Sequence, residues 1–276
     1  QKRWQVSSVS LNPPTKNRFV KGVRYLHLDL TDRLLVKESL GECFDYVVNL
    51  GGYINHQLFR DGGRILIETH FNALQNVVES ISKRNLKRFV QIGSSDEYGN
   101  APAPQHEELR EQPISPYSLA KVASTHFLQM LSRTENFPAV TLRLFLTYGP
   151  GQDSGRFLPQ IIRGCLDDDT FPTSAGEQLR DFCFVDDTVR AILQTLAVPG
   201  IDGEVFNVAS GEAVSIREMI DKVCEITGIG DPQYGDVAYR VGENMALYAD
   251  VEKAEKILQW KTSTSLDEGL QKTIGW

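Results

Sequence analysis

The chain has 276 residues, with 29 Lys or Arg, 36 Asp or Glu and a formal net charge of −7. This length suits one large domain or two unequal ones, and the acidic balance argues against a nucleic-acid or membrane-surface binder. No apolar run is long enough to span a membrane and no signal-like segment is present, so we expect a cytoplasmic protein. We expect reduced thiols and no metal site because the cysteines are scattered: Cys43, Cys165, Cys183 and Cys224.

Short apolar runs bounded by turn residues alternate with a helical pattern through the first half of the chain. An apolar stripe at helical spacing predicts a helix over 65–81. Alternation of this kind predicts an α/β fold built on a doubly wound parallel sheet. The predicted strands are Gln5–Leu11, Arg24–Leu30, Asp45–Leu50, Arg88–Gly93 and Ala139–Leu146.

The pattern changes after Tyr148, which predicts a smaller C-terminal substrate-binding lobe with ligand in the cleft. Ser215 and Glu218 form a capping box that opens a helix running to Ile226. Further elements are predicted at 157–166 (helix), 184–196 (β–α unit), 204–209 (strand) and 251–258 (short helix). We assign 1–153 and 184–209 to a dinucleotide-binding domain, and 154–183 and 210–276 to the lobe.

The segment Ser-Pro-Tyr-Ser-Leu-Ala-Lys, residues 115–121, carries the most chemistry. Tyr117 and Lys121 are four residues apart, so on a helix they share one face. An ammonium beside a phenol lowers the tyrosine pKa and makes it a general acid/base. Ser94 ends the predicted strand before this helix, so we expect it to face Tyr117. Such a trio suits redox chemistry between an alcohol and a carbonyl, with the hydride supplied by a cofactor.

Ligands of a doubly wound sheet bind at the carboxyl ends of its strands. Gly51 and Gly52 let a flat ring or ribose approach the backbone there. The cofactor-binding candidates at these ends are Ser10, Asn12, Asp29, Leu30, Asn49, Leu50, Gly51 and Gly52. Two further strands end in polar residues that are candidates to act on or bind the substrate: Ser94, Ser95, Asp96 and Thr147.

Taken together, these motifs resemble the extended short-chain dehydrogenase/reductase family of nucleotide-sugar epimerases, dehydratases and reductases. The resemblance covers essentially the whole chain and implies a Rossmann-like sheet. Its motifs are Val47–Gly52, Ile92–Gly99, Tyr117–Lys121, Tyr148–Gln152, Arg180–Phe182 and Val185–Asp187. Segments 173–182, 211–217 and 240–250 resemble 4-ketoreductases of the CDP-abequose/paratose synthase type.

The resemblance implies roles for particular residues. Ser94, Tyr117 and Lys121 match its catalytic set, with Asp96 as a further candidate. Lys121 and Tyr117 would also bind the cofactor, and Asn72 matches a buried asparagine that supports the lysine. The substrate-binding candidates are Ser95, Thr147, Arg180, Arg240 and Glu243. The resemblance assigns both arginines to the diphosphate and Glu243 to the nucleoside ribose. Of the five histidines, we expect only His56 to lie near a strand end.

The chain also departs from the family pattern. The glycine-rich phosphate loop and its strand do not occur in residues 1–276, and we expect them to precede Gln1. Ser10 stands where an acid would bind the ribose of NAD, which favours NADP over NAD. Ser95 replaces one acid of the pair that dehydratases carry, which disfavours dehydration, and Leu146 replaces an asparagine before Tyr148.

We therefore predict an NADP-linked 4-ketoreductase of a nucleotide-bound 4-keto-deoxyhexose. The alternatives are a 4-epimerase that retains NAD and, after it, a 4,6-dehydratase. A non-catalytic subunit that binds sugar nucleotides is an alternative of another class. We also predict a homodimer that pairs the helices bearing residues 67–81 and 122–131 across a two-fold axis.

Overall fold

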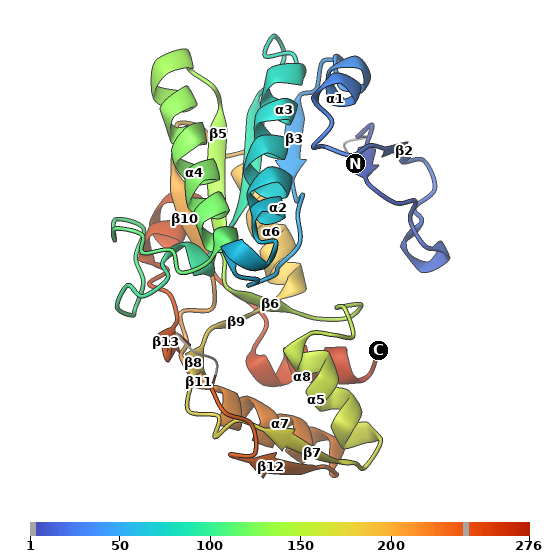
Figure 1. The fold of residues 1–276 in the computed structure, drawn as a ribbon, viewed down its shortest axis with the longest axis vertical. Helices are drawn as coiled ribbons and strands as arrows, with labels where there is room; N and C mark the ends of the chain where they lie inside the picture. Colours follow the sequence, from blue (N-terminus) through green and yellow to red (C-terminus); the bar gives the residue numbers. More distant parts are fainter. Residues whose placement is uncertain (1–3, 240–242) are drawn as a thin grey trace.

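A computed structural model describes residues 4–239 and 243–276 of the chain. Its main sheet is parallel throughout, in the order β10 (Val205–Val208), β5 (Ala139–Leu144), β4 (Arg88–Ser94) and β3 (Tyr46–Asn49). A separate parallel pair is formed by β1 (Ser7–Ser10) and β2 (Arg24–His27). The predicted α/β fold with parallel strands is confirmed, and each predicted strand of the first half is present within two to three residues (Figure 1).

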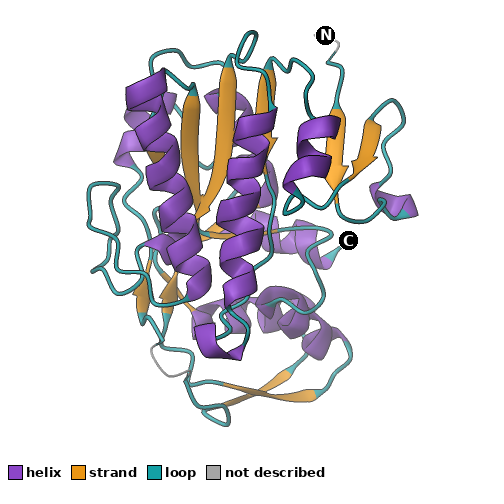
Figure 2. Ribbon diagram, turned by 45° about the horizontal axis from the view of Figure 1, so that its top comes forward, coloured by secondary structure: helices purple, strands orange, loops and turns teal. Residues whose placement is uncertain are grey.

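Helices cover both faces of the main sheet. Figures 1 and 2 show α2 (Arg64–Ile67), α3 (Ala73–Ser80) and α4 (Pro116–Glu135) on one face, and Figure 1 places α6 (Val185–Thr195) behind it. The helix α1 (Arg33–Ser39) packs beside α3. Neighbouring strand residues point to opposite faces, so Phe89 joins the core under α3 and α4 while Val90 joins the core under α6.

The predicted helix over 65–81 contains a wider turn. Between α2 and α3 lies a π-helical turn, η3 (Glu68–Asn72), which rotates the residues within it relative to a regular α-helix. His70 is consequently buried, whereas Asn72 is exposed. The prediction of a buried supporting role for Asn72 is therefore wrong. Asn76, one turn further on, is the buried asparagine, and its amide donates to the carbonyls of Leu30 and Thr31.

Several segments from the second half of the chain form the smaller lobe at the lower end of Figure 1. Its core lies between α5 (Phe157–Leu166), α7 (Ile216–Thr227) and α8 (Leu266–Ile274). The predicted capping box of α7 is present, whereas α8 was not predicted. The remaining strands are β6 (Leu146–Tyr148), β7 (Thr170–Thr173), β8 (Leu179–Arg180), β9 (Phe182–Phe184), β11 (Val214–Ser215), β12 (Asp231–Tyr234) and β13 (Ala246–Leu247). The other short helices are η1 (Lys16–Arg18), η2 (Phe59–Asp61), η4 (Ser95–Glu97) and η5 (Ala254–Leu258).

Two carboxylates of the Arg-Asp-Phe and Val-Asp-Asp motifs hold distant segments together. The Asp181 carboxylate accepts hydrogen bonds from the Ser210 and Gly211 backbone N–H groups, at 2.6 and 2.9 Å. The Asp187 carboxylate accepts from the N–H groups of Ser263 and Thr264, at 3.1 and 3.0 Å. Both side chains are buried, so these motifs act as clips between segments far apart in the chain.

Part of the C-terminal segment packs against one face of the main sheet. Ala254, Leu258 and Trp260 are buried in the core that contains Val90 and Val140 of the main sheet. Part of the range 210–276, which we assigned to the lobe, therefore packs on the sheet. The clip made by Asp187 sits beside this segment and helps to place it, since the Trp260 indole N–H donates to the Asp187 carbonyl.

We expect Asp187→Asn to destabilise the fold by about 1–3 kcal/mol near neutral pH. Burial alone would raise the pKa of Asp187, but its hydrogen bonds with Thr264 and Ser263 and the charge of Arg190 hold that pKa below the ordinary 3.8. A carboxyl whose pKa is lower in the folded than in the unfolded state stabilises the fold at pH values above its unfolded-state pKa. That stabilisation is lost as the pH falls through the folded-state pKa. Urea unfolding of wild type and variant should therefore differ most near pH 7 and converge in acid.

The matched control is Asp186→Asn, because Asp186 is the neighbouring carboxylate and is exposed. We expect it to change the free energy of unfolding by less than about 0.5 kcal/mol. Equal stability of the Asp187 and Asp186 variants at pH 7 would contradict the clip.

The outer surface of α2 and α4 carries exposed apolar side chains, which suits the predicted homodimer. Ile65, Leu119 and Met130 are each 45–49% exposed. The dimer stays a prediction. Sedimentation at micromolar concentration should give twice the monomer mass, and Leu119→Lys should shift the equilibrium toward monomer because it places a charge in an apolar contact. A wild-type monomer under these conditions would refute it.

The cysteines of the described residues form no disulfide, but they differ in burial. Cys165 and Cys183 are buried, while Cys43, expected with the mostly buried set, is exposed. Within residues 4–239 and 243–276, no group of three or more His, Cys, Asp or Glu side chains is placed to hold a metal ion. In that same part of the chain, no helix has both the length and the apolar character needed to cross a membrane.

Candidate active site

Ser94 lies at the carboxyl end of β4 and caps the short helix η4. Its side-chain oxygen accepts a hydrogen bond from the Asp96 N–H at 3.2 Å, and its own N–H donates to Glu97 Oε1 at 2.9 Å. This reciprocal cap satisfies the free N–H groups at the start of the turn. The Ser94 hydroxyl is therefore held in one place at the end of the strand where a ligand would bind.

Glu97 anchors this turn to the interior. Its carboxylate is fully buried and accepts hydrogen bonds from Arg143 Nε at 2.9 Å and from Thr125 Oγ1 at 2.8 Å. Arg143 also pairs with Glu111 and lies over the Tyr98 ring. Sequence reasoning missed this network. The signal was an arginine in the otherwise apolar strand 139–146, because a buried guanidinium requires a buried carboxylate.

Tyr117 and Lys121 lie one turn apart at the start of α4, where Ser115 caps the helix and Pro116 is its first residue. Both side chains are buried. The Lys121 ammonium lies 5.8 Å from the centre of the Tyr117 ring and donates to the Ile92 carbonyl at 2.8 Å. The structure therefore brings the serine, the tyrosine and the lysine together.

The protonation of Tyr117 differs from the sequence-based expectation. Burial raises the pKa of the phenol above its ordinary value of 10, although a hydrogen bond with Ser94 opposes this rise. The pKa of Lys121 is itself lowered to about 8 because the ammonium is buried. Lowering of the Tyr117 pKa by the lysine, as we expected, is thus not found in this state. Desolvation of the phenol outweighs the distant charge.

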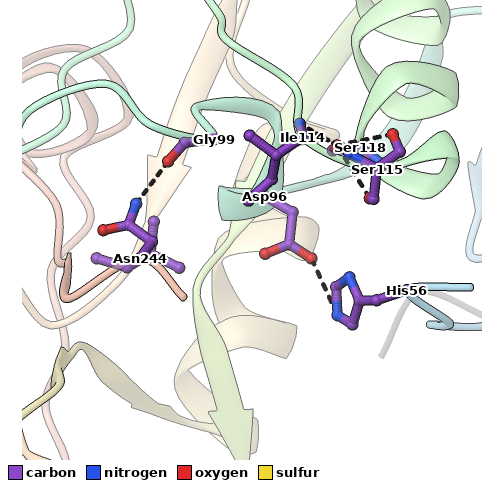
Figure 3. A pocket seen from close by; sticks show the side chains of 8 residues that line it. His56, Asp96, Gly99, Ile114, Ser115, Ser118 and Asn244 are labelled. Atoms are coloured by element: carbon purple, nitrogen blue, oxygen red, sulfur yellow. Dashed lines mark hydrogen bonds and ion pairs between the residues drawn. The ribbon is translucent and has the colours of Figure 1, made fainter. Parts of the chain in front are cut away.

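Two histidines approach the tyrosine. The rings of His70 and His56 lie edge-on to the Tyr117 ring, with centroids 5.1 and 5.9 Å away. His56 Nε2 is 3.7 Å from Asp96 Oδ2, and the two line a cavity of about 50 Å³ (Figure 3). Burial raises the pKa of Asp96, an effect that nearby His56 and Arg180 oppose. His56 was the one histidine expected near the site; the position of His70 was not anticipated.

The cofactor candidates gather at the carboxyl ends of β1, β2 and β3. Asn49 fixes the backbone at the end of β3, because its side-chain amide donates to Gln91 and its side-chain oxygen accepts from the Gly51 N–H. The Ser10 hydroxyl is turned to the Asn12 carbonyl. Asp29 bonds Thr31, and Leu30 lies beside Gly51. Asn12, Asp29 and Leu50 are exposed.

These residues fit a dinucleotide. Gly51 presents backbone without a side chain at the end of β3, and Gly52 lies against the ring of His70, which in turn meets the buried Tyr117 edge-on. His70 adds a buried ring nitrogen, Nδ1, with no hydrogen-bond partner in the described part of the chain. A nicotinamide dinucleotide would meet these groups if it lay across the strand ends.

The substrate candidates are more dispersed. Arg180 forms an ion pair with Glu243, and it lies close enough to Asp96 to affect the pKa of that carboxyl. Ser95 is buried directly after Ser94. Thr147 lies on β6, where its hydroxyl is 3.3 Å from that of Thr188. Arg240 lies outside the described residues.

A parallel sheet with a hydroxyl, a phenol and an amine at its carboxyl edge defines a class of protein, the nicotinamide-dependent oxidoreductases. The sequence model of the NAD dependent epimerase/dehydratase family matches residues 2–209. The chain belongs to this family, and the resemblance to the extended short-chain dehydrogenase/reductases is confirmed.

Relatives agree with this assignment. A probable dTDP-glucose 4,6-dehydratase of Sinorhizobium fredii is 28% identical over 93% of the chain and 79% of its own length. The solved structure of MoeE5 with UDP-glucuronic acid and NAD is 28% identical, with a TM-score of 0.85 over 99% of this chain and 90% of that one. A UDP-glucuronic acid 4-epimerase from Bacillus cereus, solved with UDP-glucuronic acid and NAD, is 25% identical, with a TM-score of 0.80 over 93% and 82%.

These findings confirm an enzyme with a Rossmann fold of the type that modifies nucleotide sugars with NAD. Family membership thus speaks against the alternative of a non-catalytic subunit. The closer resemblance to 4-ketoreductases and the preference for NADP receive no specific support and stay sequence-based predictions.

Proposed function

We propose that the protein moves a hydride to and from C4 of a nucleoside-diphosphate hexose, and that it is a 4-epimerase which retains NAD. The observation that carries the proposal is the meeting of Ser94, Tyr117 and Lys121 at the end of β4. Three such groups at one point serve proton transfer at a carbinol carbon. Family membership and the nucleotide-sugar ligands of the solved relatives support the choice of substrate class.

The residues divide the work at C4. Tyr117 takes the proton of the C4 hydroxyl during oxidation and returns it during reduction. Ser94 donates a hydrogen bond to the same oxygen and steadies its developing charge. When bound, oxidised NAD would bring a positive ring charge to the site and would then accept the hydride. Because burial raises the Tyr117 pKa, the phenol needs such added positive charge before it can act as a base.

Arg180 is the residue that we assign to the diphosphate. Its guanidinium can bind phosphate oxygens at two points, and it lies close enough to influence the charge of Asp96. Glu243, its ion-pair partner, would then turn toward the nucleoside ribose. Lys121 would bind the nicotinamide ribose from the other side of Tyr117.

The test begins with protein purified without added cofactor, which is denatured so that any released nucleotide can be identified by mass. We expect stoichiometric NAD. The same preparation is then incubated with UDP-glucose, UDP-glucuronic acid or dTDP-glucose, and the products are read by NMR. Inversion at C4 supports the proposal. A 4-keto-6-deoxy product would instead identify a dehydratase, with Asp96 and His56 as the added acid/base pair.

A 4-ketoreductase is the second candidate. It is favoured by the residues at the end of β1, which suit NADP. Ser10 presents a hydroxyl where a carboxylate would repel an added phosphate, and Asn12 follows it. An empty purified site that binds NADPH more tightly than NADH, with reduction of a nucleotide-bound 4-keto sugar, would replace the epimerase by the reductase.

A further inference from the structure

His70 is a buried titratable residue that the proposed reaction does not use. It is 5% exposed and sits in the π-helical turn η3. Its ring lies against the backbone of Gly52: a Cβ built on Gly52 would be 2.0 Å from His70 Cε1 and 2.3 Å from Nδ1. On another side the ring meets Tyr117 edge-on. His70 thus lies between the end of β3 and the catalytic tyrosine.

The hydrogen bonds of the ring determine its tautomer. His70 Nε2 is 2.9 Å from the carbonyl oxygen of Tyr53, and a carbonyl can only accept. Nε2 therefore carries the hydrogen. Burial and the nearby charge of Lys121 lower the pKa of His70 to about 4, so the ring is neutral at pH 7. A neutral ring with hydrogen on Nε2 has a lone pair on Nδ1.

That lone pair has no donor among the described residues, although it is buried. Two polar side chains near the ring have other partners: Lys121 donates to the Ile92 carbonyl, and Tyr117 is hydrogen-bonded with Ser94. A buried acceptor without a donor is costly, and native proteins rarely leave one unfilled. A donor from outside the described residues would therefore stabilise the ring.

We propose that Nδ1 of His70 accepts a hydrogen bond from a hydroxyl of the bound ligand, a ribose hydroxyl of the dinucleotide or a hydroxyl of the hexose. The inference rests on the proposed function, since it assumes that these ligands bind beside Tyr117. Nε2 holds the loop after β3 through Tyr53, and Nδ1 lies beside Gly52 at the end of β3. His70 is thus a binding residue with two separable halves.

Two variants separate the halves. In His70→Asn, the side-chain oxygen can take the place of Nδ1, while the bond to the Tyr53 carbonyl is lost. In His70→Gln, the longer side chain can donate to that carbonyl, while the acceptor near Nδ1 is lost. Wild type and variants are first stripped of the NAD that we expect them to retain, and titration calorimetry with NAD and, separately, with UDP-glucose then measures the dissociation constants. Melting temperatures measure how much the hydrogen bond to the Tyr53 carbonyl stabilises the fold.

We expect His70→Gln to keep the wild-type melting temperature and to bind one ligand about tenfold more weakly, as loss of one hydrogen bond to a ligand would produce. His70→Asn should melt earlier but bind that ligand within about threefold of wild type. Weakened NAD binding identifies a ribose as the donor, and weakened UDP-glucose binding identifies the hexose. If His70→Gln binds both ligands like wild type, or if both variants are equally weak, the proposal is overturned.

The wild-type titrations test the proposed function by themselves: binding of neither ligand refutes it whatever the variants do. His70 is then still tested by ¹⁵N NMR of the ligand-free protein at pH 7.5. We expect a protonated Nε2 and an unprotonated Nδ1. A protonated Nδ1 overturns the assignment of a free acceptor.

Discussion

Tyr117→Phe should lower turnover of the converted nucleotide sugar by about 10²- to 10⁴-fold, which is the range that general acid/base catalysis contributes. The variant removes only the hydroxyl, so the buried ring keeps its edge-on contacts with His70 and His56. The fold and the dissociation constant for NAD should therefore change little. Steady-state rates measured by NMR of the product, together with calorimetry for NAD on protein stripped of bound nucleotide, check both statements.

Ser94→Ala is the companion variant. It removes a hydrogen-bond donor to the C4 oxygen and should cost about 10²–10³ in turnover. The matched control is Tyr46→Phe, because Tyr46 begins β3 and thus lies at the amino end of the sheet, away from the site. Its turnover should equal that of wild type. Full activity of Tyr117→Phe would exclude the tyrosine as the acid/base.

Glu97→Gln should have the largest effect on stability. The substitution keeps the shape of the side chain but leaves the buried Arg143 with one carboxylate partner fewer. Breaking a buried pair in this way costs about 3–5 kcal/mol. For a protein of this size the melting temperature should fall by about 5–9 °C. Turnover should fall as well, because the Ser94 N–H loses its carboxylate acceptor.

Glu111→Gln is the control for this variant. Glu111 binds the same guanidinium, but its side chain is 15% exposed whereas that of Glu97 is fully buried. Water can compensate part of its loss, so a smaller drop in melting temperature is expected. A Glu97 variant that melts within about 2 °C of wild type would show that the buried network does not hold η4.

Much of the site could be predicted because each of its residues belongs to a short local motif. Tyr117 and Lys121 are one helical turn apart, and Ser94 directly follows an apolar strand, so local geometry alone brings them to the sheet edge. His70 and Asn72 show where such reasoning ends. The apolar stripe over 67–81 is satisfied by an ordinary helix, and nothing in it signals the π-helical turn that buries one residue and exposes the other.

The sequence by itself determined the α/β order of strands and helices, the family and the grouping of Ser94, Tyr117 and Lys121. Periodicity, turn residues and short motifs are local properties that survive without knowledge of the rest of the chain. The tertiary structure alone decided the burial that raises the Tyr117 pKa, the Glu97–Arg143 network and the free nitrogen of His70. Each of these depends on desolvation by, or contact with, segments distant in sequence, and only the folded chain brings those together.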